Sequence, residues 1–225
     1  EDLKRYRISP LIIDDFSEIT KILLEIEKRV NQNNIFISGS AKEYGAFKND
    51  EAEDFMKLLS KRLIQEDFNI ISGFGIGVGS AVITGALEEI YMHNTKINNK
   101  RLLLRPFPQG NDGKILWQQY REDMISRAGI SIFLFGNKEE ENMIVNANGV
   151  ETEFNIARNN GQIIIPVGCT GYKAQELWER INSNIENYYE DKNDDVMKAF
   201  HLLNNKLENE EIVENIIKLI KILKK

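Results

Sequence analysis

The stretch from Ile70 to Glu89, IISGFGIGVGSAVITGALEE, constrains the fold more than any other part of the sequence. A short apolar run leads into a glycine-rich turn, and a helical pattern opens at Ser80. The turn contains Gly73, Gly75, Gly77 and Gly79. In α/β domains a strand, a glycine turn and a helix bring backbone N–H groups up to a phosphate. The spacing fits neither GxGxxG nor a Walker A loop, so the turn alone indicates either a nucleotide ligand or tight strand–helix packing.

Short apolar runs alternate with helical patterns along the rest of the chain. The apolar runs predict strands at 35–37, 68–71, 101–105, 129–135 and 163–167. Helical spacing predicts helices at 9–30, 50–66, 80–92, 114–127, 150–159, 173–184, 194–206 and 209–224, and the segment 139–148 is predicted to be a loop. Near-continuous apolar strands are typical of a parallel sheet that is covered on both faces. We therefore predict an α/β fold, a Rossmann-like open doubly wound parallel sheet of about five strands with flanking N- and C-terminal helices.

A chain of 225 residues is long enough for one large domain, or for one domain with helical additions. We divide it into an N-terminal linker and helix (1–33), a nucleotide-binding domain (34–182) and C-terminal helices that pack or oligomerise (183–225). The chain begins at Glu1 rather than Met, and we expect a fragment of a longer protein.

Charge and cysteine content limit the possible partners. The chain has 29 basic and 35 acidic residues and a formal net charge of −6, which argues against a general nucleic-acid binder. No apolar run approaches the length of a membrane span. Cys169 is the single cysteine and cannot form an internal disulfide, so we expect a cytoplasmic protein. His93 and His201 lack neighbours at metal-ligand spacing, and we expect neither a metal site nor a Ser-His-Asp triad.

The carboxyl ends of the predicted strands combine glycines with polar residues. These ends include SGS (38–40), SGFG (72–75) and FGNK (135–138). In doubly wound sheets a ligand binds outside these ends, at the point where the strand order reverses. The clustering therefore favours a nucleotide-like ligand in a crevice that includes Gly39 and Ser40.

Three side chains could carry the chemistry, and each also has an ordinary structural explanation. Arg121 is either a surface arginine paired with Glu122 or Glu153, or a clamp for phosphate. Lys138 is either a solvated loop lysine or an anion contact at the ligand edge of the sheet. Glu153 either favours a helix N-terminus because of the helix dipole, or accepts hydrogen bonds from ribose hydroxyls, or acts as a general base.

Six motifs taken together resemble a known family. They are ISGSAKEYG (37–45), ISGFGIGVGSAVITGALEE (71–89), LLLRPFP (102–108), WQQYREDM (117–124), IFLFGNK (132–138) and GVETEFNIA (149–157). In this order they resemble the SLOG family, in the branch associated with Sir2 and TIR domains. This branch includes the C-terminal sensor domain of Thoeris anti-phage effectors. The resemblance covers about residues 34–182.

The resemblance implies a receptor rather than an enzyme. The expected ligand is a cyclic ADP-ribose isomer made by a TIR-domain protein, with no tightly bound cofactor. Binding is expected to rearrange a homo-oligomer, a dimer or tetramer, and to activate a linked Sir2-like NAD hydrolase. By the same resemblance Arg121 and Lys138 hold the pyrophosphate, while Glu153 contacts a ribose or orders the two cations. Further ligand contacts are expected from Gly39, Ser40, Gly75, Gly77, Gly79, Gly136 and Gly149.

Two other functions of the same fold remain open. LOG enzymes, which hydrolyse nucleoside monophosphates to a free base and a ribose phosphate, resemble this chain in carrying an Arg on one helix and a Glu on another. Their PGGxGTxxE signature is absent, because the aligned stretch NANGVETE keeps only Gly149 and Glu153, which favours binding without turnover. A DprA-like single-strand DNA binder is disfavoured by the acidic charge and the lack of a basic aromatic groove.

Overall fold

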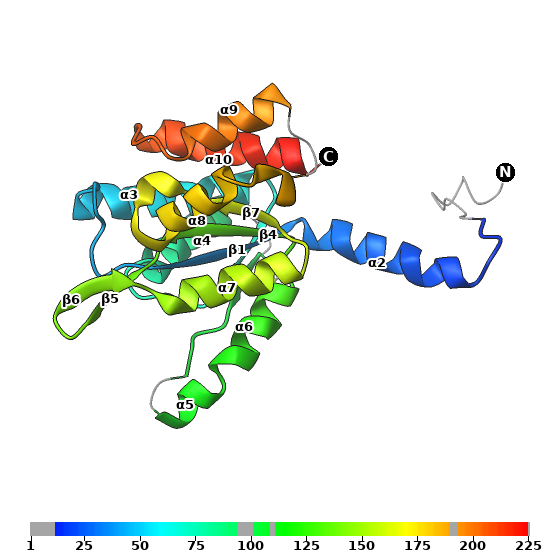
Figure 1. Cartoon of the computed structure of the whole chain (residues 1–225), viewed down its shortest axis with the longest axis horizontal. Coiled ribbons are helices and arrows are strands. Elements are labelled where there is room, and N and C mark those ends of the chain that lie inside the picture. The colour runs from blue at the N-terminus through cyan, green and yellow to red at the C-terminus, as the bar shows by residue number, and fades with distance from the viewer. Residues whose placement is uncertain (1–11, 94–100, 109–110, 190–192, 225) are drawn as a thin grey trace.

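The computed structural model describes residues 12–93, 101–108, 111–189 and 193–224 (Figure 1). Its centre is a five-stranded parallel sheet in the order β3-β2-β1-β4-β7. The strands are β1 (Asn34–Ser40), β2 (Asn69–Ser72), β3 (Leu102–Leu104), β4 (Ile130–Phe135) and β7 (Ile163–Pro166). This sheet confirms the predicted α/β fold, and each of its strands overlaps a predicted one.

The strand order reverses beside β1. The chain runs outward from β1 to β2 and β3, and then returns to β4 on the other side of β1. The register pairs Ile37 with both Ser72 and Ile132, and it pairs Ser40 with Phe135. The carboxyl ends of β1 and β4 therefore lie side by side where the two halves of the sheet diverge, which is the usual ligand position in such folds.

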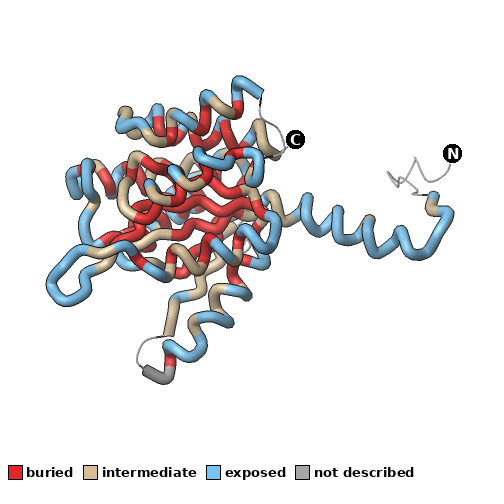
Figure 2. The backbone as a smooth tube through the Cα atoms, viewed as in Figure 1, coloured by how far each residue is buried: buried red, intermediate tan, exposed pale blue. Residues whose placement is uncertain are grey.

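Helices cover both faces of the sheet. α3 (Asn49–Gln65) packs against α4 (Gly79–His93), and α6 (Trp117–Ser126) packs against α7 (Asn148–Asn159). Every residue of β4 is buried (Figure 2). Its Ile, Leu and Phe side chains suit a central strand that is covered on both faces.

Three helices follow β7 and pack on the rest of the domain. They are α8 (Tyr172–Asn182), α9 (Asp194–Leu202) and α10 (Asn209–Leu223), with short 3-10 turns at Gly168–Thr170 and Ile185–Asn187. α10 contacts α3 and α9, and it buries a row of apolar residues that includes Ile212, Ile216 and Ile220. This helix covers part of the domain's own core.

The segment predicted to be a loop, 139–148, is largely a hairpin. β5 (Asn137–Glu140) pairs antiparallel with β6 (Met143–Asn146), and the loop prediction was wrong. The sequence NKEE lacks the apolar content of a typical strand, so its pattern did not reveal the pairing. A tight turn makes the hairpin, because Glu141 and Asn142 both adopt positive φ, as a type I′ turn requires.

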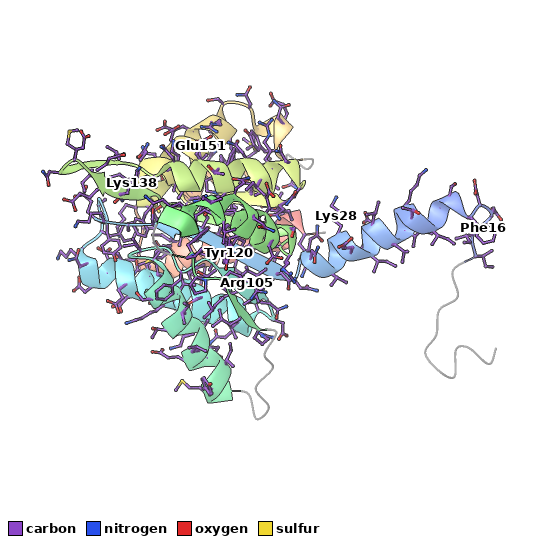
Figure 3. The ribbon with its side chains drawn as sticks, turned by 90° about the horizontal axis from the view of Figure 1, so that it is seen from below. Phe16, Lys28, Arg105, Tyr120, Lys138 and Glu151 are labelled. Carbon is purple, nitrogen blue, oxygen red and sulfur yellow. The ribbon has the colours of Figure 1, made fainter. Side chains whose placement is uncertain are left out.

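The first helix begins later than predicted and extends away from the body. α2 (Ser17–Asn31) starts after Asp15, whose carboxylate accepts the N–H of Ser17 at 2.9 Å, and residues 9–11 lie outside the described part of the chain. Figures 1 and 3 show α2 projecting beyond the sheet domain. None of its residues is buried, and its apolar side chains include Leu23 and Val30, both more than half exposed.

The predicted helix 114–127 is two helices. α5 (Asn111–Ile115) ends before Leu116, whose N–H bonds back to the carbonyl of Gly113 at 3.0 Å, and α6 then begins at Trp117. The break redirects the chain, and α6 packs against α7.

The glycine turn between β2 and α4 lies against the end of β1. A Cβ on Gly75 would overlap the carbonyl oxygen of Gly39, and one on Gly77 would overlap that of Ala41. The Ala41 N–H donates to the Ile76 carbonyl at 2.8 Å and holds the two segments together. The turn therefore needs glycine at these two positions because the backbones of the two segments touch. This agrees with close packing, one of the two functions that the sequence indicated for the turn.

Gly85 sets the contact between α3 and α4, and Gly85→Ala tests it. A Cβ there would overlap the carbonyl oxygen of Lys57 and lie 2.7 Å from its Cα. We expect Gly85→Ala to lower the free energy of unfolding by about 1–3 kcal/mol through overpacking, although alanine is the better helix former by about 1 kcal/mol. Urea denaturation measures the difference.

Thr84→Ala is the matched control, because Thr84 is the exposed neighbour on the same helix. Its expected change is within about 0.5 kcal/mol. A Gly85→Ala protein as stable as the wild type would mean that α3 and α4 do not need this close approach.

Candidate ligand-binding site

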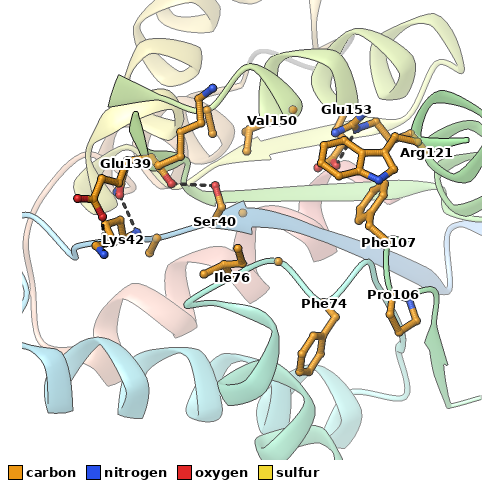
Figure 4. A pocket seen from close by; sticks show the side chains of 18 residues that line it. Ser40, Lys42, Phe74, Ile76, Pro106, Phe107, Arg121, Glu139, Val150 and Glu153 are labelled. Atoms are coloured by element: carbon orange, nitrogen blue, oxygen red, sulfur yellow. Dashed lines mark hydrogen bonds and ion pairs between the residues drawn. The ribbon is translucent and has the colours of Figure 1, made fainter. Parts of the chain in front are cut away.

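A cavity of about 490 Å³ opens at the carboxyl ends of β1, β2 and β4, where the strand order reverses (Figure 4). Its walls come from the loop after β1, the glycine turn, the segment after β3, α6, the hairpin and the start of α7. The lining residues are Gly39, Ser40, Ala41, Lys42, Phe74, Gly75, Ile76, Pro106, Phe107, Trp117, Arg121, Asn137, Lys138, Glu139, Ala147, Gly149, Val150 and Glu153. A volume of this size accommodates a nucleotide-sized molecule.

The cavity brings together most of the residues predicted for the site. Those that line it are Gly39, Ser40, Gly75, Arg121, Lys138, Gly149 and Glu153. Three predicted glycines lie outside the lining and serve the backbone instead. Gly77 has a φ of +73° and abuts Ala41, Gly79 abuts Phe74, and Gly136 has a φ of +93° beside Lys173.

Arg121 reaches the cavity from α6 and is paired with Glu153. Its Nε donates to Glu153 Oε1 at 3.3 Å, and the two side chains are only 13% and 9% exposed. The guanidinium also lies over the rings of Phe107, at 5.1 Å, and Trp117, at 5.7 Å. The sequence offered a surface pair of Arg121 with Glu122 or Glu153. The partner is Glu153, but the pair is enclosed rather than on the surface.

Glu153 is held by two donors inside the protein. Ser38 Oγ donates to Glu153 Oε2 at 2.5 Å, while Arg121 bonds the other oxygen. Burial raises the pKa of the Glu153 carboxyl above its ordinary value, and the contacts with Ser38 and Arg121 oppose this shift. The carboxylate therefore ties β1 and α6 to α7 at one end of the cavity.

Lys138 enters the cavity from the hairpin and is more accessible. Its Nζ pairs with Glu140 Oε2 at 3.0 Å, and its side chain is 39% exposed. Beside it Lys42 pairs with Glu139 at 2.5 Å. Ion pairs this exposed contribute little free energy, so either lysine can exchange its carboxylate for another anion at low cost.

Sequence reasoning missed Asn137, which fixes the loop after β1. This residue is 1% exposed. Its Oδ1 accepts the N–H groups of Lys42 at 2.8 Å and Glu43 at 3.2 Å, and its Nδ2 donates to the Glu43 carbonyl at 2.8 Å. A polar residue one glycine beyond the most apolar strand was the available signal.

The aromatic wall beside Arg121 was also missed. Phe107 and Trp117 meet edge to face with centroids 5.8 Å apart, and Trp117 Nε1 donates to the Pro108 carbonyl at 2.8 Å. The spacing of Trp117 and Arg121, four residues apart on one helix, could have indicated this contact.

The amino end of α7 faces the cavity through Ala147, Gly149 and Val150. Ala147 is the N-cap residue, and its methyl side chain cannot accept the N–H groups of the first turn. A Cβ on Gly149 would lie 2.8 Å from Arg121 Nη2, so glycine lets the guanidinium approach this helix end. The cavity thus combines cations with the positive end of a helix dipole, an arrangement suited to an anion.

In the described ranges, no three His, Cys, Asp or Glu side chains are grouped so that they could hold a metal ion. Burial raises the pKa of the Cys169 thiol to about 12, which makes it a poor nucleophile. None of the described helices combines the length and the apolar character needed to span a membrane.

The fold and the cavity define an α/β protein of Rossmann-like topology with a cation-bearing crevice at its topological switch point. The chain belongs to the Sir2- and TIR-associating SLOG family, whose sequence model matches residues 18–223. The match confirms the resemblance drawn from the six motifs and extends it to the flanking helices.

Curated relatives agree with the family assignment. The chain is 47% identical over 223 residues to the NAD(+) hydrolase ThsA of Bacillus cereus (strain MSX-D12), covering 99% of this chain and 47% of the relative. It is 44% identical to the protein of that name from Cytobacillus dafuensis, covering 99% and 46%, and 38% identical to that from Acinetobacter baumannii (strain 532279), covering 98% and 48%. The chain therefore spans about half the length of the curated relatives it matches.

The environment of Glu153 predicts an unusual pH dependence. The unfolded carboxyl titrates near 4.5 and the folded one above it, so ionisation costs the folded state free energy as pH rises through the folded pKa. We expect the stability of Glu153→Gln relative to wild type to increase from pH 4.5 upward. Urea denaturation across pH 4–8 measures it.

Glu151 on the same helix is the control with the opposite sign. Arg180, more than Lys173, holds the pKa of its carboxyl below the usual value, so its contribution is complete above pH 4.5 and is lost as pH falls through the folded pKa. Glu151→Gln should be less stable than wild type at pH 7, with the gap closing in acid. Parallel pH profiles for the two variants would contradict the assignment at Glu153.

Proposed function

We propose that this chain is the sensor half of an NAD-hydrolysing anti-phage effector and that it binds a cyclic ADP-ribose isomer produced by a TIR-domain protein. Binding regulates a Sir2-like NAD hydrolase linked to it in a longer cytoplasmic protein, through rearrangement of a homo-oligomer. The observation that carries the proposal is the meeting of Arg121, Lys138 and the uncapped start of α7 in one cavity at the switch point. Relatives that are named NAD(+) hydrolases and are about twice as long support it.

A diphosphate matches the charges around the cavity. It carries two negative charges, and Arg121 and Lys138 reach the cavity from separate segments, α6 and the hairpin. Arg121 bonds Glu153 through Nε, which leaves the guanidinium further donors for phosphate oxygens. Lys138 releases Glu140 and takes a phosphate oxygen instead, because its present ion pair is exposed and weak.

Glu153 suits a role in binding better than a role in turnover. Both carboxylate oxygens are engaged, one by Ser38 and the other by Arg121. A general base must be within reach of the proton that it removes, and this carboxylate is instead committed to holding Arg121. The oxygens keep some acceptor capacity, which fits a hydrogen bond from a ribose hydroxyl.

Isothermal titration of the chain with the cyclic ADP-ribose isomers tests the proposal. We expect Lys138→Ala and Arg121→Lys each to weaken binding about ten- to a hundredfold, because each loses a charge-assisted contact worth about 1.5–3 kcal/mol. Arg121→Lys keeps the charge beside Glu153 and removes only the planar fork.

Lys61→Ala is the matched control, since Lys61 forms a similar exposed pair with Glu88 at 3.0 Å but does not line the cavity. It should bind as the wild type does. Folded protein that gives no heat at high micromolar concentrations of any isomer would refute the proposal.

A second function, LOG-like hydrolysis of nucleoside monophosphates, is favoured by one observation. Burial raises the pKa of the Glu153 carboxyl above its ordinary value, which is the direction that suits a catalytic acid, and Arg121 lies beside it. Incubation with AMP followed by chromatography decides the matter. Free adenine that disappears with Glu153→Ala would establish the enzyme in place of the sensor.

A further inference from the structure

Ile76 is a large apolar residue that is exposed at the mouth of the ligand cavity. Its side chain is 81% exposed, yet it lines the cavity from the glycine turn, where Gly75 and Gly77 flank it. Covering a large exposed apolar side chain with an apolar surface of a ligand is favourable, because it removes both surfaces from water.

The backbone around Ile76 is held in place. Its carbonyl accepts the Ala41 N–H at 2.8 Å, and the glycines on either side abut the carbonyl oxygens of Gly39 and Ala41. Just before it Phe74 adopts a φ of +58°, and its N–H donates to Ser72 Oγ at 3.2 Å. The turn therefore presents Ile76 to the cavity and leaves the side chain no route into the core.

A second apolar side chain lies on the opposite wall. Val150, at the start of α7, lines the cavity, and Figure 4 shows it across the opening from Ile76. Val150 is packed in the core and 3% exposed, so it offers the cavity a small, fixed apolar contact. The charged groups lie toward the two ends, with Arg121 and Glu153 at one and Lys42 and Glu139 at the other. The middle of the cavity is thus apolar on two facing sides.

We propose that Ile76 and Val150 form a subsite for the purine base of a nucleotide, with Ile76 as the residue that selects ligands carrying a base. This rests on the proposed function, because it takes the diphosphate to lie at Arg121 and Lys138. A purine has two flat apolar faces, so one face covers Ile76 while the other meets Val150. Phosphate groups without a base cannot use this surface.

The test compares ligands with and without a base. Isothermal titration uses ADP-ribose, AMP and inorganic pyrophosphate against wild type, Ile76→Ala and Ile76→Leu. We expect Ile76→Ala to weaken ADP-ribose and AMP binding about five- to twentyfold and to leave pyrophosphate within about twofold, since the lost contact is apolar. Ile76→Leu, which keeps an apolar side chain of the same size, should bind the nucleotides nearly as tightly as the wild type does.

Met92→Ala is the control, because Met92 is 71% exposed on α4 and does not line the cavity. It should change none of the three affinities. Equal losses for nucleotide and pyrophosphate with Ile76→Ala, unchanged nucleotide binding, or wild-type protein that binds AMP no more tightly than pyrophosphate would each overturn the inference.

The outcomes also separate this inference from the proposed function. Wild-type protein that binds AMP and ADP-ribose through Ile76 but gives no heat with the cyclic isomers would leave the base subsite in place and refute the proposed ligand. Cyclic isomers that bind Ile76→Ala as tightly as the wild type would support the proposed ligand and refute the base subsite.

Discussion

The enclosed pair of Arg121 and Glu153 is the interaction that fixes the arginine end of the cavity. It joins α6 to α7, and through Ser38 it also joins both helices to β1. A buried pair of this kind is a modest source of stability, because removing both charges from water offsets much of their attraction. Its effect is positional, since it fixes a guanidinium beside the uncapped start of a helix, with aromatic rings along its other side.

The opposite side of the cavity is organised by backbone contacts rather than by charge. The glycine turn touches the carbonyl groups of Gly39 and Ala41, and Asn137 bonds the backbone of Lys42 and Glu43. Together they hold the ends of β1, β2 and β4 at fixed separations. Rigid strand ends and weakly paired lysines give a cavity whose shape is set in advance while its charges stay exchangeable.

Local patterns were sufficient for the sheet and for the position of Lys138 at its edge. The five apolar runs gave the strands, and the position of Lys138 after the central strand placed it at the ligand edge. Features that depend on distant segments were not predictable. Gly77 was predicted to contact the ligand, but it packs against Ala41 instead. Asn137 acts through the loop after β1, which is distant in sequence. The hairpin depends on the turn at Glu141 and Asn142 more than on the composition of its strands.

The short connection between α2 and β1 has a mechanical consequence. α2 ends at Asn31 and β1 begins at Asn34, and the other end of that strand is Ser40 in the cavity wall. The helix is about 22 Å long, at 1.5 Å per residue. A helix of this length attached at one end has the geometry of a lever: a tilt of about 5° at Asn31 would carry its far tip about 2 Å.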